Sequence, residues 1–252
     1  MEALRVYIFA PAWGLPSSGP FALKLLAWLS HAGIPYQAVV ENRPNRGPQG
    51  KSPWITEGAQ TLGDSDAIIS HLALKHGMPD PTRIYTAEDA CRDAMKLAFE
   101  ERFHQILEWE LFLHPEGFDG MQRYISALAP PVIGGLILRQ MRRHFRHQLR
   151  ARGVGRHAPE QIAAMGRRQL DALALCLDKG GGWLGKDGPA LADFACWGQV
   201  APLLAWPMAT PVASHAKSLP ALENWHQAIM HRCFGGMTPP QRQATGAMTI
   251  PA

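Results

Sequence analysis

The chain has 252 residues, of which 46% are hydrophobic and 18% are charged, so its composition is that of a globular protein and excludes a disordered one. Its length allows one large domain or two modest ones. The longest apolar run of the later part, 132–138, contains two glycines and is too short to cross a bilayer. The beginning of the chain has no pattern of a targeting signal, so we expect a cytoplasmic protein that does not enter the membrane.

The first part of the chain alternates between patterns typical of strands and of helices. β-branched and aromatic residues indicate strands, and apolar residues at a 3.6-residue period indicate helices. A Pro/Gly/Ser loop over 11–20 separates the first strand from the first helix. The order β-α-β, loop, β-β-α predicts one compact α/β module, followed by a linker over 78–86. The predicted elements are strands over 4–10, 36–40, 53–56 and 60–62 and helices over 21–32 and 64–76.

Everything after the linker has helical patterns. Long stretches rich in Ala, Leu, Arg and Glu keep an apolar stripe, and a glycine triplet at 180–182 ends one of them. We therefore expect an α/β domain over 1–78, an all-helical domain over 87–234 and a coil tail over 235–252. The predicted helices cover 87–113, 131–152, 158–179, 191–206 and 222–231.

The cysteines and histidines do not form a metal-binding or disulfide pattern. His144 and His147 share a helix face, but no third ligand is evident, so no metal is expected. The four cysteines are far apart and form no CxxC pair, which favours buried thiols in a reducing compartment. They are Cys91, Cys176, Cys196 and Cys233.

The positive charge of the chain, +4 overall, is concentrated between Arg139 and Arg156. Such a run can attract an anion, an acidic partner or nucleic acid. A solvated face of a long helix explains the same run, and we favour that interpretation. Binding of nucleic acid is not expected, because no aromatic residues with a recognition pattern accompany the charges.

Several short motifs occur in a fixed order along the chain. They are Gly-Pro-Phe-Ala-Leu-Lys at 19–24, Ala-Gly-Ile-Pro-Tyr at 32–36, Gly-Lys-Ser-Pro-Trp-Ile at 50–55, Gly-Asp-Ser-Asp-Ala-Ile at 63–68, Gly-Arg-His at 155–157, and Leu184-Gly185 through Ala192-Asp193. These motifs resemble those of the glutathione transferase superfamily, and in particular its metaxin and failed-axon-connections-like branch. The resemblance implies an α+β protein, with an N-terminal thioredoxin-like α/β domain that binds glutathione and an all-helical C-terminal domain.

The resemblance implies a binding site for glutathione in the first domain. Ser65 would hold the γ-glutamyl carboxylate and Asp64 would add polar contacts, although both residues can equally well cap a helix. Pro53 would be a cis-proline, with Trp54 pairing its main chain with the cysteinyl part of glutathione; the alternative is a trans-proline that opens an edge strand. Lys51 would face the glycyl carboxylate, unless it is only solvated.

The resemblance also implies where the thiol of glutathione would be activated. The thiolate is the nucleophile, and each unit by which a thiol pKa falls requires about 1.4 kcal/mol of differential stabilisation. Ser18 or Ser17 would donate a hydrogen bond to it, and the alternative is that both are ordinary loop residues. Gly19 and Ala22 occupy the positions where cysteine-type members carry cysteines. A catalytic cysteine is therefore excluded at this loop, and the expected type is a serine-type transferase.

Aromatic residues at the front loop and on the first long helix are candidates for the second-substrate pocket. Trp13, Trp109 and Phe112 would line it between the domains, although such residues are more often core. Asp193 would cap a late helix in the helical domain, but Ala190 stands where the family has a Ser or Thr, so half of that cap is missing.

Two functions follow from these observations. The first is a glutathione S-transferase that uses glutathione as co-substrate and conjugates, or otherwise activates, its thiolate toward a small hydrophobic electrophile. The alternative is a non-catalytic protein of the same fold that serves as a binding or assembly module. The family resemblance implies a homodimer in either case.

Overall fold

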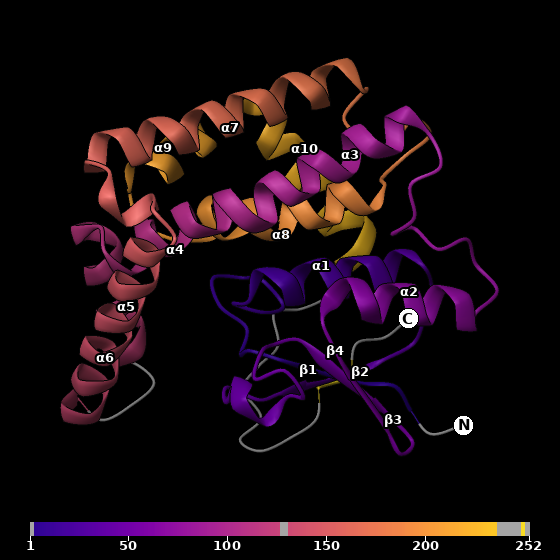
Figure 1. Cartoon of the computed structure of the whole chain (residues 1–252), viewed down its shortest axis with the longest axis horizontal. Coiled ribbons are helices and arrows are strands. Elements are labelled where there is room, and N and C mark those ends of the chain that lie inside the picture. Colours follow the sequence, from indigo (N-terminus) through magenta and orange to yellow (C-terminus); the bar gives the residue numbers. More distant parts are fainter. Residues whose placement is uncertain (1–2, 127–130, 236–247, 250–252) are drawn as a thin grey trace.

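The structure is a computed structural model that describes residues 3–126, 131–235 and 248–249 (Figure 1). Its strands form one mixed sheet in the order β4-β3-β1-β2-β5. β1 pairs with β2 in parallel and with β3 antiparallel, and β3 pairs with β4 antiparallel. The strands are β1 (Arg5–Ile8), β2 (Gln37–Val40), β3 (Trp54–Glu57), β4 (Gln60–Gly63) and β5 (Met248–Thr249).

Two helices, α1 (Pro20–His31) and α2 (Ser65–Lys75), lie between the sheet and the helices that follow (Figure 1). The sheet and these helices have the thioredoxin-like arrangement, and the later part of the chain is almost entirely helical, so the predicted α+β fold is confirmed. The later helices are α3 (Ala87–Leu97), α4 (His104–Phe112), α5 (Pro115–Ser126), α6 (Pro131–Ala151), α7 (Pro159–Lys179), α8 (Leu191–Ala205), α9 (Pro211–Lys217) and α10 (Pro220–Phe234). Short 3-10 turns lie at η1 (Pro44–Arg46) and η3 (Val154–Arg156), and a π-helical segment, η2, at Ala98–Phe103.

Three features differ from the sequence-based prediction. The helix expected over 87–113 has a π-helical segment in its middle, so α3, η2 and α4 follow one another. α5 and α9 were not predicted. The prediction of a coil tail over 235–252 is wrong for Met248–Thr249, which pairs antiparallel with β2. A strand of two residues forms because of its pairing with β2 and carries no sequence pattern of its own. Residues 236–247 and 250–252 of the predicted tail lie outside the described residues.

α1 is packed on several sides: it contacts α2, α8 and α10, and it lies between the sheet and α8 (Figure 1). Its apolar residues, such as Leu23 and Leu26, are 0% exposed. The closest approach to α8 is at Gly198, where a Cβ atom would lie 2.3 Å from the carbonyl oxygen of Pro20. The glycine therefore permits the contact between α8 and the first turn of α1.

A cluster of charges also joins α1 to its neighbours. Lys24, only 1% exposed, places its Nζ 2.5 Å from Asp66 Oδ1 and 2.6 Å from Glu100 Oε1. Lys96 Nζ lies 2.6 Å from Asp66 Oδ2 and 3.1 Å from Asp93 Oδ1. Burial alone would raise the pKa of Asp66, but Lys24 and Lys96 hold it below its usual range. Burial raises the pKa of Glu100 despite the nearby Lys24. The cluster links α1, α2, α3 and η2.

Asp193 at the start of α8 holds the preceding loop in place. Its fully buried carboxylate accepts hydrogen bonds from the backbone N–H groups of Leu184, Gly185 and Ala190 and from Trp225 Nε1. Ala190 returns no side-chain bond, so the expected half-cap is confirmed. The backbone N–H of Asp193, which such a hydroxyl would accept, donates instead to the carbonyl of Ala190 at 3.0 Å.

No helix in the part of the chain that the structure describes is long and apolar enough to cross a membrane. The cysteines are all free thiols, with Cys196 and Cys233 buried and Cys91 and Cys176 exposed. The expectation of buried thiols is therefore correct for Cys196 and Cys233 and wrong for Cys91 and Cys176, which lie on the outer faces of their helices.

Candidate functional site

The turn before β3 contains a cis peptide bond between Ser52 and Pro53, as the family resemblance implies. Pro53 is buried, and the ring of Trp54 stacks on Tyr7 of β1 with ring centroids 4.9 Å apart and an interplanar angle of 3°. Lys51 is exposed at the same turn. These residues form one wall of the candidate site, next to the edge where β1 ends.

Trp54 itself is held inside the sheet. It is in register with Tyr7 on β1 and with Gly63 on β4, so strands flank its main chain on both sides. Ser52 lies just outside the strand, and its buried hydroxyl oxygen has no hydrogen-bond partner within the described residues. Ser52 is not among the residues predicted from the sequence, and the only signal for it is its place before the proline. A ligand that pairs with this turn would meet Ser52 before Trp54.

Asp64 and Ser65 form the N-terminus of α2 and have different environments. Asp64 adopts a positive φ of 72° and accepts hydrogen bonds from Asp66 N and Ala67 N, both at 3.0 Å. Its side chain is therefore occupied as a helix cap, which was one of the two interpretations left open by the sequence. Ser65 is 7% exposed, and its hydroxyl has no hydrogen-bond partner among the described residues. The helix dipole and the first backbone N–H groups favour an anion at this end.

The two serines at the start of α1 also differ. Ser17 is 0% exposed; its hydroxyl donates to the carbonyl of Phe9 at 3.0 Å and accepts from Gly19 N at 3.1 Å. Ser18 is half-buried, and its backbone N–H donates to the carbonyl of Ala10 at 2.9 Å. The Ser18 hydroxyl has no partner in the described ranges. Ser17 thus shapes the loop, and Ser18 keeps a hydroxyl available at the positive end of α1.

The three aromatic residues predicted for the second-substrate pocket do not all lie together. Trp13, at a positive φ of 52°, packs on Tyr124 of α5 with ring centroids 5.4 Å apart. Phe112 stacks on Phe145 at 4.0 Å, within a small apolar cluster against which Trp13 also packs. Trp109 belongs to the main core and is 8% exposed. Trp13 and Phe112 therefore belong to one cluster, in which Phe112 is itself buried, whereas Trp109 lies in the main core.

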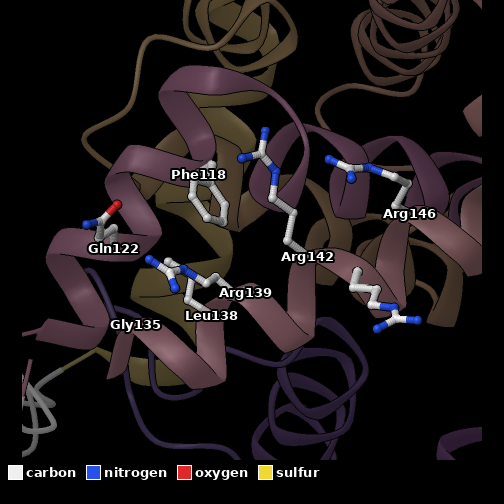
Figure 2. A pocket seen from close by; sticks show the side chains of 8 residues that line it. Phe118, Gln122, Gly135, Leu138, Arg139, Arg142 and Arg146 are labelled. Atoms are coloured by element: carbon white, nitrogen blue, oxygen red, sulfur yellow. The ribbon is translucent and has the colours of Figure 1, made fainter. Parts of the chain in front are cut away.

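A cavity of about 440 Å³ lies between α5 and α6, and none of the residues predicted to bind or activate glutathione lines it (Figure 2). Four of its lining residues are arginines of α6. Within the described residues, no group of three or more His, Cys, Asp or Glu side chains has the geometry of a metal site. The chemistry available at the candidate site is hydrogen bonding by hydroxyls and backbone N–H groups at two helix N-termini.

Comparison with known proteins shows which family this N-terminal domain resembles. Residues 20–117 match the family described as "Glutathione S-transferase N-terminal domain". Over these residues the chain is similar to the glutathione S-transferase superfamily. The resemblance found in the sequence motifs is therefore confirmed. The turn at Pro53 and the N-terminus of α2 lie within the matched residues, whereas Ser17 and Ser18 precede them.

Two curated relatives are similar to the chain over about 70% of its length. The chain is 29% identical over 192 residues to the isoprene-epoxide–glutathione S-transferase of Rhodococcus sp. (strain AD45), covering 69% of this chain and 76% of that protein. It is 26% identical over 190 residues to Failed axon connections of Drosophila melanogaster, covering 70% of this chain but only 44% of that protein.

A solved glutathione S-transferase-type structure superimposes over most of the chain. The beta-etherase LigF of Sphingobium sp. strain SYK-6 aligns with a TM-score of 0.59 and 17% identity, over 90% of this chain and 95% of that one. At this identity the similarity shows that the fold is shared and says nothing of the substrate.

Proposed function

We propose that this chain is a glutathione S-transferase that binds glutathione along the turn at Pro53 and the N-termini of α1 and α2. The observation that carries the proposal is the pair of available serine hydroxyls, Ser18 and Ser65, each at the positive end of a buried helix. Ser65 and the first N–H groups of α2 would bind the γ-glutamyl carboxylate. Asp64 fixes this end of the helix as its cap and contacts the ligand's polar groups from there.

The proposed role of Ser18 is to hold glutathione as a thiolate. A hydroxyl donor and the helix dipole favour the charged form, and lowering a thiol pKa from about 8.5 by one unit needs about 1.4 kcal/mol. Ser17 supports this role indirectly, because its hydroxyl bonds to Phe9 and Gly19 and thereby fixes the loop before Ser18. Ser17 is therefore a positioning residue in this proposal.

The main chain at Ser52, Pro53 and Trp54 would align the cysteinyl part of the peptide, and Lys51 would face the glycyl carboxylate. The unpartnered hydroxyl of Ser52 supports a polar ligand at this turn. For the second substrate, the half-buried ring of Trp13, in the loop that carries Ser18, offers an apolar surface, and the buried Phe112 supports it from the same cluster. A small apolar electrophile fits that chemistry, and the name of the Rhodococcus relative points to an epoxide.

Titration calorimetry with glutathione tests the binding, and ultraviolet absorbance of the bound thiolate, followed over pH, tests the activation. Ser18→Ala should retain binding but raise the thiol pKa by about one unit and reduce conjugation of a small epoxide about tenfold. Ser17→Ala is the matched comparison: it should lower the melting temperature, because it leaves the buried N–H of Gly19 without its acceptor. Absence of binding at millimolar glutathione would refute the proposal.

A second candidate function is a non-catalytic binding or assembly module. It is favoured by the absence of cysteine at Gly19 and Ala22 and by the similarity to Failed axon connections. This function predicts glutathione binding with no conjugation activity in the unmodified protein, so the same measurements separate the two.

We also propose that the chain forms a homodimer in a cytoplasmic location. Three large apolar residues on the linker and α3 are exposed to solvent and support an interface there. They are Ile84, Tyr85 and Leu97, which are 55%, 70% and 47% exposed. Light scattering at micromolar protein concentration tests the dimer, and a monomer under these conditions contradicts it.

A further inference from the structure

Four arginines of α6 line the cavity between α5 and α6. Their spacing along the helix, i, i+3, i+4 and i+7, places them on one face. In Figure 2, Arg139 and Arg142 extend toward Phe118 and Gln122 of α5, and Arg146 follows from a later turn of α6. The remaining lining residues, Gly135 and Leu138, add an apolar floor. The lining residues are Phe118, Gln122, Gly135, Leu138, Arg139, Arg142, Arg143 and Arg146.

Within the described residues, acidic side chains do not neutralise the four cavity arginines, of which Arg139, Arg143 and Arg146 are exposed. None of the four forms an ion pair with a carboxylate in the ranges that the structure describes. By contrast, Arg152 lies 3.8 Å from Glu108, and Arg156 Nε donates to the carbonyl of Arg150 at 2.8 Å. Like charges three and four residues apart on a helix repel each other. An anion placed between them would relieve this repulsion.

Arg142 is the most constrained of the four. Its guanidinium carbon lies 4.2 Å from the centroid of the Phe118 ring, and its Nε is buried without a hydrogen-bond partner among the described residues. A buried guanidinium nitrogen without an acceptor is unfavourable unless a ligand supplies one. The buried nitrogen of Arg142 therefore offers a donor to a ligand, and the three exposed guanidinium groups beside it add positive charge at the same cavity.

We propose that this cavity is a binding site for a small molecule that carries a diphosphate, or two phosphate groups close together. Arginine binds phosphate oxygens through paired N–H donors. The four arginines extend over about 10 Å of the helix, at a rise of 1.5 Å per residue, which exceeds the reach of a single phosphate. Leu138 and the edge of Phe118 would contact an apolar part of the ligand.

The shape of the site distinguishes a small ligand from a macromolecule. The volume of about 440 Å³ is within the range of small-molecule sites. Duplex nucleic acid and a membrane surface bind to broad basic faces, whereas these guanidinium groups line a hollow between two helices. The site shares no lining residue with Ser18, Pro53 or Ser65, so it is separate from the proposed glutathione site.

Titration calorimetry of the full chain with inorganic pyrophosphate, at low ionic strength, tests the proposal. The unmodified protein should bind pyrophosphate saturably and more tightly than inorganic phosphate. The test variant Arg139→Gln/Arg143→Gln should weaken pyrophosphate binding at least tenfold, because each lost charged hydrogen bond is worth roughly one power of ten. The control variant Arg150→Gln/Arg168→Gln removes the same charge from exposed positions outside the cavity and should change binding less than twofold.

Three outcomes would overturn the proposal. The first is that pyrophosphate shows no saturable binding at millimolar concentration. The second is that the test and control variants lose pyrophosphate affinity equally. The third is that duplex DNA or phosphatidylserine-containing vesicles bind more tightly than pyrophosphate and that the test variant weakens this binding. A melting curve shows whether the test variant folds; if it does not, Arg146→Gln replaces it with the same expected direction. Glutathione binding, measured in the same variants, should be unchanged, so the outcome is independent of the proposed function.

Discussion

Replacing Lys24 by methionine tests whether the charge cluster holds α1 against α2 and η2. Lys24 is 1% exposed and Glu100 9%, while Asp66 is 33% exposed and also contacts Lys96. Removing one partner of a buried ion pair costs about 3–5 kcal/mol. We expect a loss near the lower end, about 3 kcal/mol, because Asp66 keeps Lys96 and Glu100 can take up a proton.

Urea unfolding followed by circular dichroism measures the free energy of unfolding of each variant. In Lys24→Met, Glu100 loses the lysine that is hydrogen-bonded to it and keeps only the weaker attraction of Lys96, so its pKa in the folded state should rise further above the unfolded value. The folded state then binds more protons than the unfolded state, and the variant should lose stability as pH rises and regain it as pH falls. Adding Glu100→Gln to Lys24→Met should restore more than half of the loss at pH 7.

Lys75→Met is the matched control, because Lys75 pairs with Glu57 on the surface and is 39% exposed. Exposed ion pairs contribute about 0–1 kcal/mol, so this variant should unfold at nearly the original urea concentration. A cost of Lys24→Met no larger than that of Lys75→Met would refute the reasoning. So would a double variant with Glu100→Gln that is no more stable than Lys24→Met alone.

Three further predictions concern single residues. Gly198→Ala should destabilise the protein by about 1–3 kcal/mol in urea unfolding, because the new Cβ would lie 2.3 Å from the carbonyl oxygen of Pro20; an unchanged midpoint contradicts this. Asp193→Ala should cost at least about 3 kcal/mol in the same assay, because several buried donors lose their acceptor, and a loss below 1 kcal/mol would show that water replaces it. Burial lowers the pKa of His226, whose Nδ1 accepts a hydrogen bond from Trp197 Nε1 at 3.0 Å, so stability should fall as pH decreases below about 6.5, where the unfolded chain takes up the proton first. His226→Gln should flatten this dependence in melting curves between pH 5 and 7, and an identical slope in both proteins would disprove the assignment.

The sequence predicted the elements whose residues carry their own pattern. α1 is the clearest case, because three signals in its sequence predict the same helix. They are the period of its apolar residues, Pro20 at its start and Gly33 after its end. α5 was missed because Gly117 and Gly120 weaken the helical pattern. Both glycines serve close packing: a Cβ would lie 1.8 Å from the carbonyl oxygen of Glu110 and 2.3 Å from Met208, respectively. Contacts between distant segments of this kind cannot be read from local sequence.

The candidate site was likewise predicted only in part from the sequence. The sequence located the loop and the turn, but Ser17 and Ser18 were equivalent until the hydrogen bond from Ser17 to Phe9, eight residues away, distinguished them. Ser52 could not be selected, because its unpartnered hydroxyl is a property of burial in the folded chain. The role of a serine hydroxyl depends on which hydrogen bonds it already forms within the folded chain.

The π-helical segment Ala98–Phe103 determines how the two ends of the long helix are oriented around its axis. A wider turn accommodates one extra residue, which rotates everything after it by about 100° relative to an uninterrupted α-helix. α3 can therefore face α8, while α4 faces α5 and α6. Deleting a single residue within 98–103 would leave a helix of nearly the same length but would point Trp109 and Phe112 away from their present neighbours. Homologues of this chain should vary in length in the loops around this helix and keep a constant number of residues within it.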